Sequence, residues 1–150
     1  MAPPPVQDLQ HWTLVTSDVE RSKRFYTEIL GATPLARDWP PSVRFGNTTI
    51  DMFATTDDQH PEPGSLGQHH AYGIRLEDYD AWTDHLQKCG LEFFRATHGT
   101  RRISIYVDDP DGYHIELTAA IADAEQGRRE IEKRGLDRYT NPAGPQDRPS

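Results

Sequence analysis

An internal repeat is the feature of this sequence that most constrains its fold. HWTLVTSDVERSKRFYTEILG runs from His11 to Gly31, and HHAYGIRLEDYDAWTDHLQKCG runs from His69 to Gly90. Both segments predict the same succession: a histidine, a strand, a turn, an amphipathic helix and a helix-ending glycine. The histidine and the glycine are 20 positions apart in the first segment and 21 in the second. The chain is therefore predicted to contain two copies of one structural module.

The ends of the two halves also match. GNTTIDM (46–52) parallels DGYHIEL (111–117), which places Asp51 at the position of Glu116. Each half then predicts strand–helix–strand–strand–strand. We expect an α+β protein in which two tandem βαβββ modules form a concave mixed-sheet cleft.

The same patterns divide the 150 residues into regions. The predicted regions are a Pro-rich flexible arm at 1–7, a domain at 8–120 with modules at about 8–56 and 68–120 and a linker at 57–67, and a C-terminal helix and tail at 121–150. Helices are predicted at 18–30, 78–89 and about 119–134. Strands are predicted at 9–16, 43–45, 48–53, 69–76, 91–94, 103–107 and 113–118.

Composition excludes several classes of partner. The net charge is −8 and the basic residues are scattered, which argues against nucleic acid and against an anionic membrane surface. No apolar run approaches the roughly 18 residues of a membrane span. The single cysteine, Cys89, excludes an internal disulfide and fits a reducing compartment, and we expect it on the apolar side of its helix. With no secretory signal at the N-terminus, the expected location is the cytoplasm.

Strand alternation separates the two adjacent histidines of the repeat, because successive side chains on a strand point to opposite faces. The large apolar side chains of the two opening strands belong on the helix-covered face: Trp12, Leu14, Tyr72 and Ile74. His11 and His69 alternate with them and should point to the opposite, open face. His70 shares the helix-covered face and is expected to be structural.

The closing strands extend this assignment. Ile50, Met52, Ile115 and Leu117 take the covered face, which sends Asp51 and Glu116 to the open one. The open face should also carry Arg102, Ser104 and Tyr106. His11, His69 and Glu116 then form a set of two imidazoles and one carboxylate. A metal ion bound by these three groups would keep further coordination positions free. This set suits Fe(II) or a similar divalent ion, while Asp51 is expected to be a ligand, an acid/base group or part of the cleft lining.

The chain resembles the vicinal oxygen chelate superfamily over about residues 8–120. This superfamily includes glyoxalase I, bleomycin-resistance proteins, fosfomycin-resistance enzymes and extradiol dioxygenases. HHAYGI is similar to the second-half strand whose histidine, here His69, is a metal ligand. DDPDGYHIEL is similar to the closing hairpin whose glutamate, here Glu116, is another. The resemblance implies one divalent metal, a small-molecule substrate and a homodimer.

One segment resembles the extradiol ring-cleavage signature. In THGTRRISIYVDDPDGYHIE (97–116), the characteristic residues fall at His98, Tyr106, Pro110, Gly112 and Glu116, although Ala96 departs from the usual start of the signature. The resemblance implies that Tyr106 hydrogen-bonds a metal-bound catecholate and that His98 steadies the substrate. The main expectation is therefore an Fe(II)-dependent dioxygenase acting on a catechol-like small molecule.

Other members of the superfamily offer alternatives. GNTTIDMF lacks the distal base histidine of extradiol enzymes. TIDM instead resembles the glyoxalase segment that supplies an acidic ligand, here Asp51, which suits a lyase or isomerase using Ni, Zn, Mn or Co. The fosfomycin thiol transferases also align, with Thr13, Ser104 and Tyr106 facing the substrate. Their lysine falls near Ala96, so Arg101 or Arg102 would bind an anion instead, and strand parity favours Arg102. A non-catalytic, drug-sequestering resistance protein is the further alternative.

Overall fold

The computed structural model describes residues 3–37, 39–56 and 69–136. The chain divides into two compact units, residues 1–61 and 62–150, and each is described by itself. The predicted linker at 57–67 and most of the tail lie outside the described residues. Across the described ranges, no helix is both long and apolar enough to cross a membrane.

The first unit contains one mixed, four-stranded sheet. Its elements are β1 (His11–Thr16), α1 (Val19–Arg24), the π-helical turn η1 (Phe25–Ile29), β2 (Thr33–Pro34), β3 (Ser42–Phe45) and β4 (Thr48–Ala54). The strand order is β1-β4-β3-β2, with β1 parallel to β4 and the other pairs antiparallel. This is the predicted βαβββ order, including the short strand β2, which the sequence patterns had not located.

Local sequence explains how the first helix begins and ends. Asp18 caps α1, because its carboxylate accepts a hydrogen bond from the backbone N–H of Arg21 at 2.9 Å. The helical segment ends before Gly31, whose φ of 74° is the left-handed conformation that glycine adopts readily. The covered sheet face is apolar, with Trp12, Leu14, Tyr26, Ile50 and Met52 all buried.

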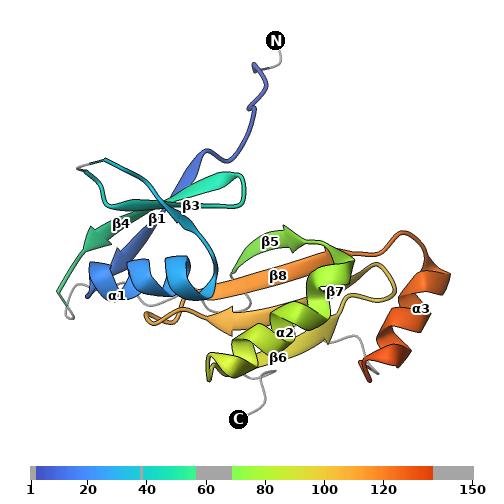
Figure 1. Cartoon of the computed structure of the whole chain (residues 1–150). Helices are drawn as coiled ribbons and strands as arrows, with labels where there is room; N and C mark the ends of the chain where they lie inside the picture. Colours follow the sequence, from blue (N-terminus) through green and yellow to red (C-terminus); the bar gives the residue numbers. More distant parts are fainter. Residues whose placement is uncertain (1–2, 38, 57–68, 137–150) are drawn as a thin grey trace. The chain divides into compact units, whose positions relative to one another are not determined.

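The second unit repeats this arrangement. Its elements are β5 (His70–Ile74), the 3-10 turn η3 (Leu76–Asp78), α2 (Tyr79–Lys88), β6 (Phe93–Thr97), β7 (Arg102–Asp108), β8 (His114–Ala120) and α3 (Ala124–Lys133). The strand order is β5-β8-β7-β6, with β5 parallel to β8. Helix α2 lies across one face of this sheet (Figure 1). The prediction of two βαβββ modules is therefore confirmed.

Two predictions near the end of α2 were wrong. Strand β6 begins at Phe93 and not at Leu91, because the N–H of Leu91 still bonds the carbonyl of Leu86 and closes the helix. Cys89 is exposed, whereas we expected it on the apolar side. The buried residues of α2 are Tyr79 and Leu86, and Cys89 lies beyond them at the cap, where the helix no longer covers the sheet.

The last helix starts later than predicted and is fixed to the rest of the second unit at both ends. Strand β8 continues to Ala120, and Asp123 then caps α3 by accepting from the N–H of Gln126 at 2.8 Å. Near its start, Gly127 lies against Thr100, so close that an added Cβ would be 2.3 Å from the Thr100 carbonyl oxygen.

Just beyond the end of α3, Arg134 is held by two partners on or near α2. Its guanidinium binds both carboxylate oxygens of Asp80, at 2.7 and 3.0 Å. The same guanidinium carbon lies 5.2 Å from the centre of the Tyr79 ring, a cation–π contact. The C-terminal helix is thus an integral part of the second unit.

Candidate functional site

Strand register places the predicted site residues of the second unit on one face of its sheet. Two rows cross β5, β8 and β7 side by side: Ala71, Glu116 and Tyr106 in one, Gly73, Thr118 and Ser104 in the other. This face is opposite the one packed by Ile103, Ile105, Ile115 and Leu117. The small residues of β5 on this face, Ala71 and Gly73, are exposed.

Glu116 is the centre of this face. Its side chain is only 3% exposed, and Oε2 lies 2.8 Å from Nε2 of His69. The hydroxyl of Ser104 donates to the other oxygen, Oε1, at 2.6 Å, and the same hydroxyl oxygen is 3.0 Å from Oγ1 of Thr118. A buried carboxylate needs such partners, because removing it from water is otherwise costly. Ser104 therefore fixes the orientation of Glu116, while His69 pairs with its remaining oxygen.

A tyrosine and a second histidine adjoin this carboxylate. Nε2 of His98 is 3.0 Å from the hydroxyl of Tyr106 and 3.5 Å from Oε1 of Glu116. The Tyr106 ring stacks on Phe94, with centroids 4.7 Å apart, and meets the ring of His69 edge-on at 5.6 Å. The tyrosine is therefore held on three sides, and its hydroxyl points to the carboxylate cluster.

The protonation of this pair follows from its surroundings. Burial lowers the pKa of His98, and the charge of Arg102 and the neighbouring imidazole of His69 lower it further, against the opposing effect of Glu116. Burial, together with the charge of Glu116, raises the pKa of Tyr106 well above its ordinary value. Tyr106 thus stays a neutral phenol near neutral pH and can donate its proton to the neutral imidazole of His98.

The first unit holds the remaining predicted residues. His11 and Thr13 are exposed on β1, on the side opposite the buried Trp12 and Leu14, as strand alternation predicts. Thr13 pairs in register with Asp51 on β4. The carboxylate of Asp51 binds the guanidinium of Arg37 and accepts a hydrogen bond from Ser42 at 2.8 Å. Asp51 is therefore already engaged in an ion pair.

The structure thus brings together five predicted site residues in the second unit: His69, His98, Ser104, Tyr106 and Glu116. Arg102 is exposed at the start of β7, and its charge acts on both His98 and Tyr106. The part played by His11, Thr13 and Asp51 stays a prediction. Sequence reasoning missed Phe94 and Thr118, although both share the strand parity of the site residues.

The donors of the second unit suit a divalent ion in their chemistry. His69 and Glu116 supply an imidazole nitrogen and a carboxylate oxygen that already lie within hydrogen-bond distance of each other. Among the described residues, no group of three or more His, Cys, Asp or Glu side chains is arranged to hold a metal ion. The predicted triad draws its third ligand, His11, from the first unit and stays a prediction.

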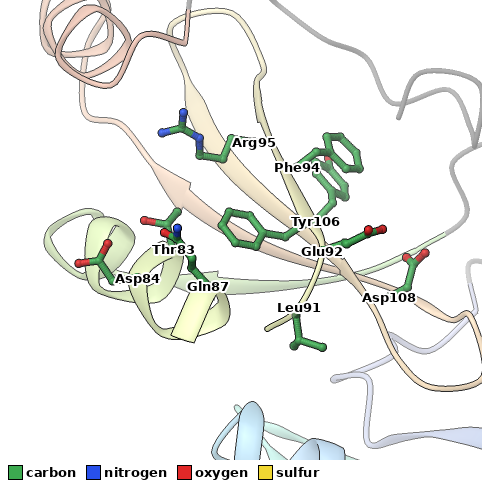
Figure 2. A pocket seen from close by; sticks show the side chains of 10 residues that line it. Thr83, Asp84, Gln87, Leu91, Glu92, Phe94, Arg95, Tyr106 and Asp108 are labelled. Carbon is green, nitrogen blue, oxygen red and sulfur yellow. The ribbon is translucent and has the colours of Figure 1, made fainter. Parts of the chain in front are cut away.

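A pocket adjoins this site within the second unit. It has a volume of about 700 Å³ and is bounded by the second half of α2, by Leu91 and Glu92, by β6 and by Tyr106 and Asp108 of β7. Figure 2 shows side chains from these elements around it. We call it the α2–β6 pocket. Tyr106 belongs both to this pocket and to the carboxylate cluster.

Comparison with known proteins identifies the family. Residues 8–117 match the Glyoxalase/Bleomycin resistance protein/Dioxygenase superfamily, and the chain belongs to this superfamily. The resemblance noted in the sequence is confirmed.

Individual relatives are similar over most of the chain. The glutathione transferase FosA of Serratia marcescens is 29% identical over 115 residues, which cover 75% of this chain and 80% of the relative. The lactoylglutathione lyase of Neisseria meningitidis serogroup A is 32% identical over 124 residues, 73% of this chain and 88% of the relative. A mutant of the fosfomycin resistance protein FosX of Listeria monocytogenes, solved with Mn(II) and 1S,2S-dihydroxypropylphosphonic acid, shares the fold. Its TM-score is 0.64 at 20% identity, with 81% of this chain and 98% of that one covered.

Proposed function

We propose that this protein is a metal-dependent enzyme that transfers a thiol to a small anionic electrophile. The observation that carries the proposal is the buried Glu116, held by Ser104, paired with His69 and flanked by Tyr106 and His98. The similarity to a glutathione transferase and to a lactoylglutathione lyase supports thiol chemistry better than the ring-cleaving dioxygenase that residues 97–116 led us to expect.

We infer that His11, His69 and Glu116 hold the metal. Mn(II), present in the FosX structure, is a candidate ion, as are Ni, Zn, Co and the Fe(II) first expected. A divalent ion at this place would supply Lewis acidity to an oxygen atom of the substrate. Ser104 keeps one oxygen of Glu116 occupied, so that the other oxygen and the imidazole of His69 remain as the donors.

The other residues of the site would bind the electrophile and move a proton. In the proposed reaction the thiol sulfur attacks a carbon of an oxirane. The new C–S bond forms as the C–O bond breaks, and the thiol proton ends on the resulting hydroxyl. The hydroxyl of Tyr106, a neutral phenol bonded to His98, would turn its hydrogen from His98 to the developing oxyanion and stabilise it. Arg102 supplies positive charge for an anionic substrate, and Thr13 would contact it from the first unit.

Asp51 has a different place in this proposal. We expected a ligand, an acid/base group or a lining residue, and its carboxylate is bound to Arg37 and Ser42. Acting as a base would require breaking this ion pair. We therefore propose that Asp51 positions Arg37, which lies between β2 and β3, and does not take part in proton transfer.

A ring-cleaving dioxygenase is the second candidate, and one observation favours it. The 3.0 Å contact between His98 and Tyr106 joins two of the five residues that the extradiol signature marks. Fe(II) and a catechol-like substrate would then replace the thiol and the electrophile. The two candidates differ in their substrates and in their need for dioxygen, so one set of assays separates them.

The test uses metal-free protein loaded anaerobically with Mn(II), Ni, Zn, Co or Fe(II) in turn. Each form is given glutathione with fosfomycin and followed by ³¹P NMR, glutathione with methylglyoxal and followed by absorbance, or catechol with dioxygen and examined for a yellow product. We expect a new phosphonate resonance that requires both metal and glutathione and is lost in His69→Ala. A yellow product with Fe(II) alone would establish the second candidate instead. Inactivity of every form, with drug binding retained, would leave the sequestering protein. Sedimentation of the same samples tests the predicted homodimer.

A further inference from the structure

We propose that the α2–β6 pocket binds the thiol cosubstrate, a small peptide with a free ammonium group and carboxylates. Glu92 and Asp108 would receive the ammonium, Arg95 a carboxylate, and the sulfur would lie at the Tyr106 end. This assignment rests on the proposed function, because it presumes that a thiol is consumed.

The size and lining of the pocket suit such a ligand. Its volume of about 700 Å³ lies within the range of roughly 300–1,000 Å³ that is usual for small-molecule sites. Leu91, Phe93 and Phe94 provide apolar surface for methylene groups, and Thr83 and Gln87 provide groups that can bond peptide amides. The pocket thus combines apolar walls with a few polar groups, as ligand sites generally do.

Two carboxylates lie opposite each other at one side of the pocket. Phe93 begins β6 and pairs with Val107, and Figure 2 shows the side chains of Glu92 and Asp108 just beyond this pair. Like charges that lie near one another repel. Asp108 bonds Nδ1 of His114 at 2.8 Å, whereas Glu92 has no ion-pair or hydrogen-bond partner among the described residues. An ammonium group between them would relieve the repulsion.

One guanidinium completes the set of charges. Arg95 is exposed on β6, and it too has no hydrogen-bond or ion-pair partner in the part of the chain that the structure describes. Figure 2 shows Arg95 apart from Glu92 and Asp108, on another side of the pocket. A peptide that carries an ammonium group and carboxylates at separate points can contact both sides, which a simple amine or a simple acid cannot.

Tyr106 links this pocket to the carboxylate cluster. Its ring stacks on Phe94, which lines the pocket, and its hydroxyl bonds His98. The same ring meets His69 edge-on at 5.6 Å. A sulfur atom at the Tyr106 end of the pocket would therefore lie beside the residues that we assign to the electrophile.

The experiment measures binding without chemistry. S-methylglutathione, whose sulfur cannot react, is titrated into the metal-free full-length protein by calorimetry and by ¹H–¹⁵N NMR. We expect saturable binding with shifts concentrated in residues 83–95 and 106–108. Glu92→Gln should weaken binding about threefold, the effect of one solvent-accessible charge. Glu132→Gln, which removes another exposed charge, from α3, should leave the affinity unchanged.

A second ligand identifies the group that Glu92 receives. N-acetyl-S-methylglutathione lacks the ammonium and should bind the unaltered protein about threefold more weakly, but should lose nothing further in Glu92→Gln. Equal affinity for both ligands, or shifts confined to other residues, would overturn the assignment of the pocket. If S-methylglutathione binds as described but no metal supports thiol transfer, only the proposed function is refuted. Thiol transfer that Glu92→Gln leaves unchanged would refute only the assignment of the pocket.

Discussion

Replacing Ser104 by alanine tests the central arrangement of the site most directly. Ser104 is fully buried, and its hydroxyl donates to Oε1 of Glu116 at 2.6 Å. Nε2 of His98 lies 3.5 Å from this oxygen, which is too far to replace the bond. A hydrogen bond to a charged acceptor contributes about 1.5–3 kcal/mol, so we expect Ser104→Ala to lower the free energy of unfolding by about this amount.

The same substitution should weaken metal binding. Groups that orient a ligating carboxylate typically contribute about 10–100-fold to metal affinity. The loss arises because Glu116 would be free to turn Oε1 toward other partners. Calorimetric titration of Mn(II) or Zn into metal-free protein measures the affinity, and urea denaturation of the same sample measures stability. Thr118→Val is the matched control, since it removes the other contact of Ser104 and leaves the bond to Glu116 in place.

The two measurements separate the possible explanations. Ser104→Ala with unaltered stability and unaltered metal affinity would refute the reasoning, because the buried carboxylate would then not depend on this donor. Reduced stability with full metal affinity would show that Ser104 serves only the fold. An equal loss of metal affinity in Thr118→Val would mean that Ser104 acts through the packing of the strand and not through its hydrogen bond.

Three further outcomes follow from the structure. His69→Ala should abolish metal binding, while His70→Ala, on the helix-covered face, should lower the melting temperature but retain the metal; metal loss in both would refute this division. Gly127→Ala should destabilise the protein by about 1–3 kcal/mol in urea, because a Cβ would be 2.3 Å from the carbonyl of Thr100. Burial raises the pKa of Tyr79 to about 12 from 10.0, which favours the neutral phenol in the folded state. About 2–3 kcal/mol of stability should therefore be present below pH 10 and be lost between pH 10 and 12. In Tyr79→Phe the loss over this interval should be smaller by this amount, and the remainder should come from Tyr106, whose pKa is also raised by burial.

Strand alternation predicted most of the second-unit site. It assigned His69, Ser104, Tyr106 and Glu116 to one face, because burial on the helix side forces a period of two on each strand. The repeat then fixed which of the two adjacent histidines belongs to that face. Assigning a side chain to a sheet face needs only the alternation within its own strand. These assignments could therefore be made without knowing how the strands pair.

Contacts that depend on loops were beyond such reasoning. The ion pair between Arg37 and Asp51 joins a loop to β4, and no periodicity reports where a loop side chain lies. The bond between His98 and Tyr106 depends in the same way on the turn after β6. The exposed Cys89 shows the same limit, because helical periodicity does not show where a helix ends. The role of His11 rests on the repeat and on family membership, and stays a prediction.

The C-terminal helix has a practical consequence for anyone who shortens this protein. A chain ending at residue 121 would retain every predicted site residue and the whole family match at 8–117. It would nevertheless lose the contact between Gly127 and Thr100. This contact supports the turn that follows His98. The shortened chain would also uncover the Tyr79 ring, which Arg134 now covers. The boundary of the folded, functional unit therefore lies beyond the boundary of the family homology, at or after Arg134.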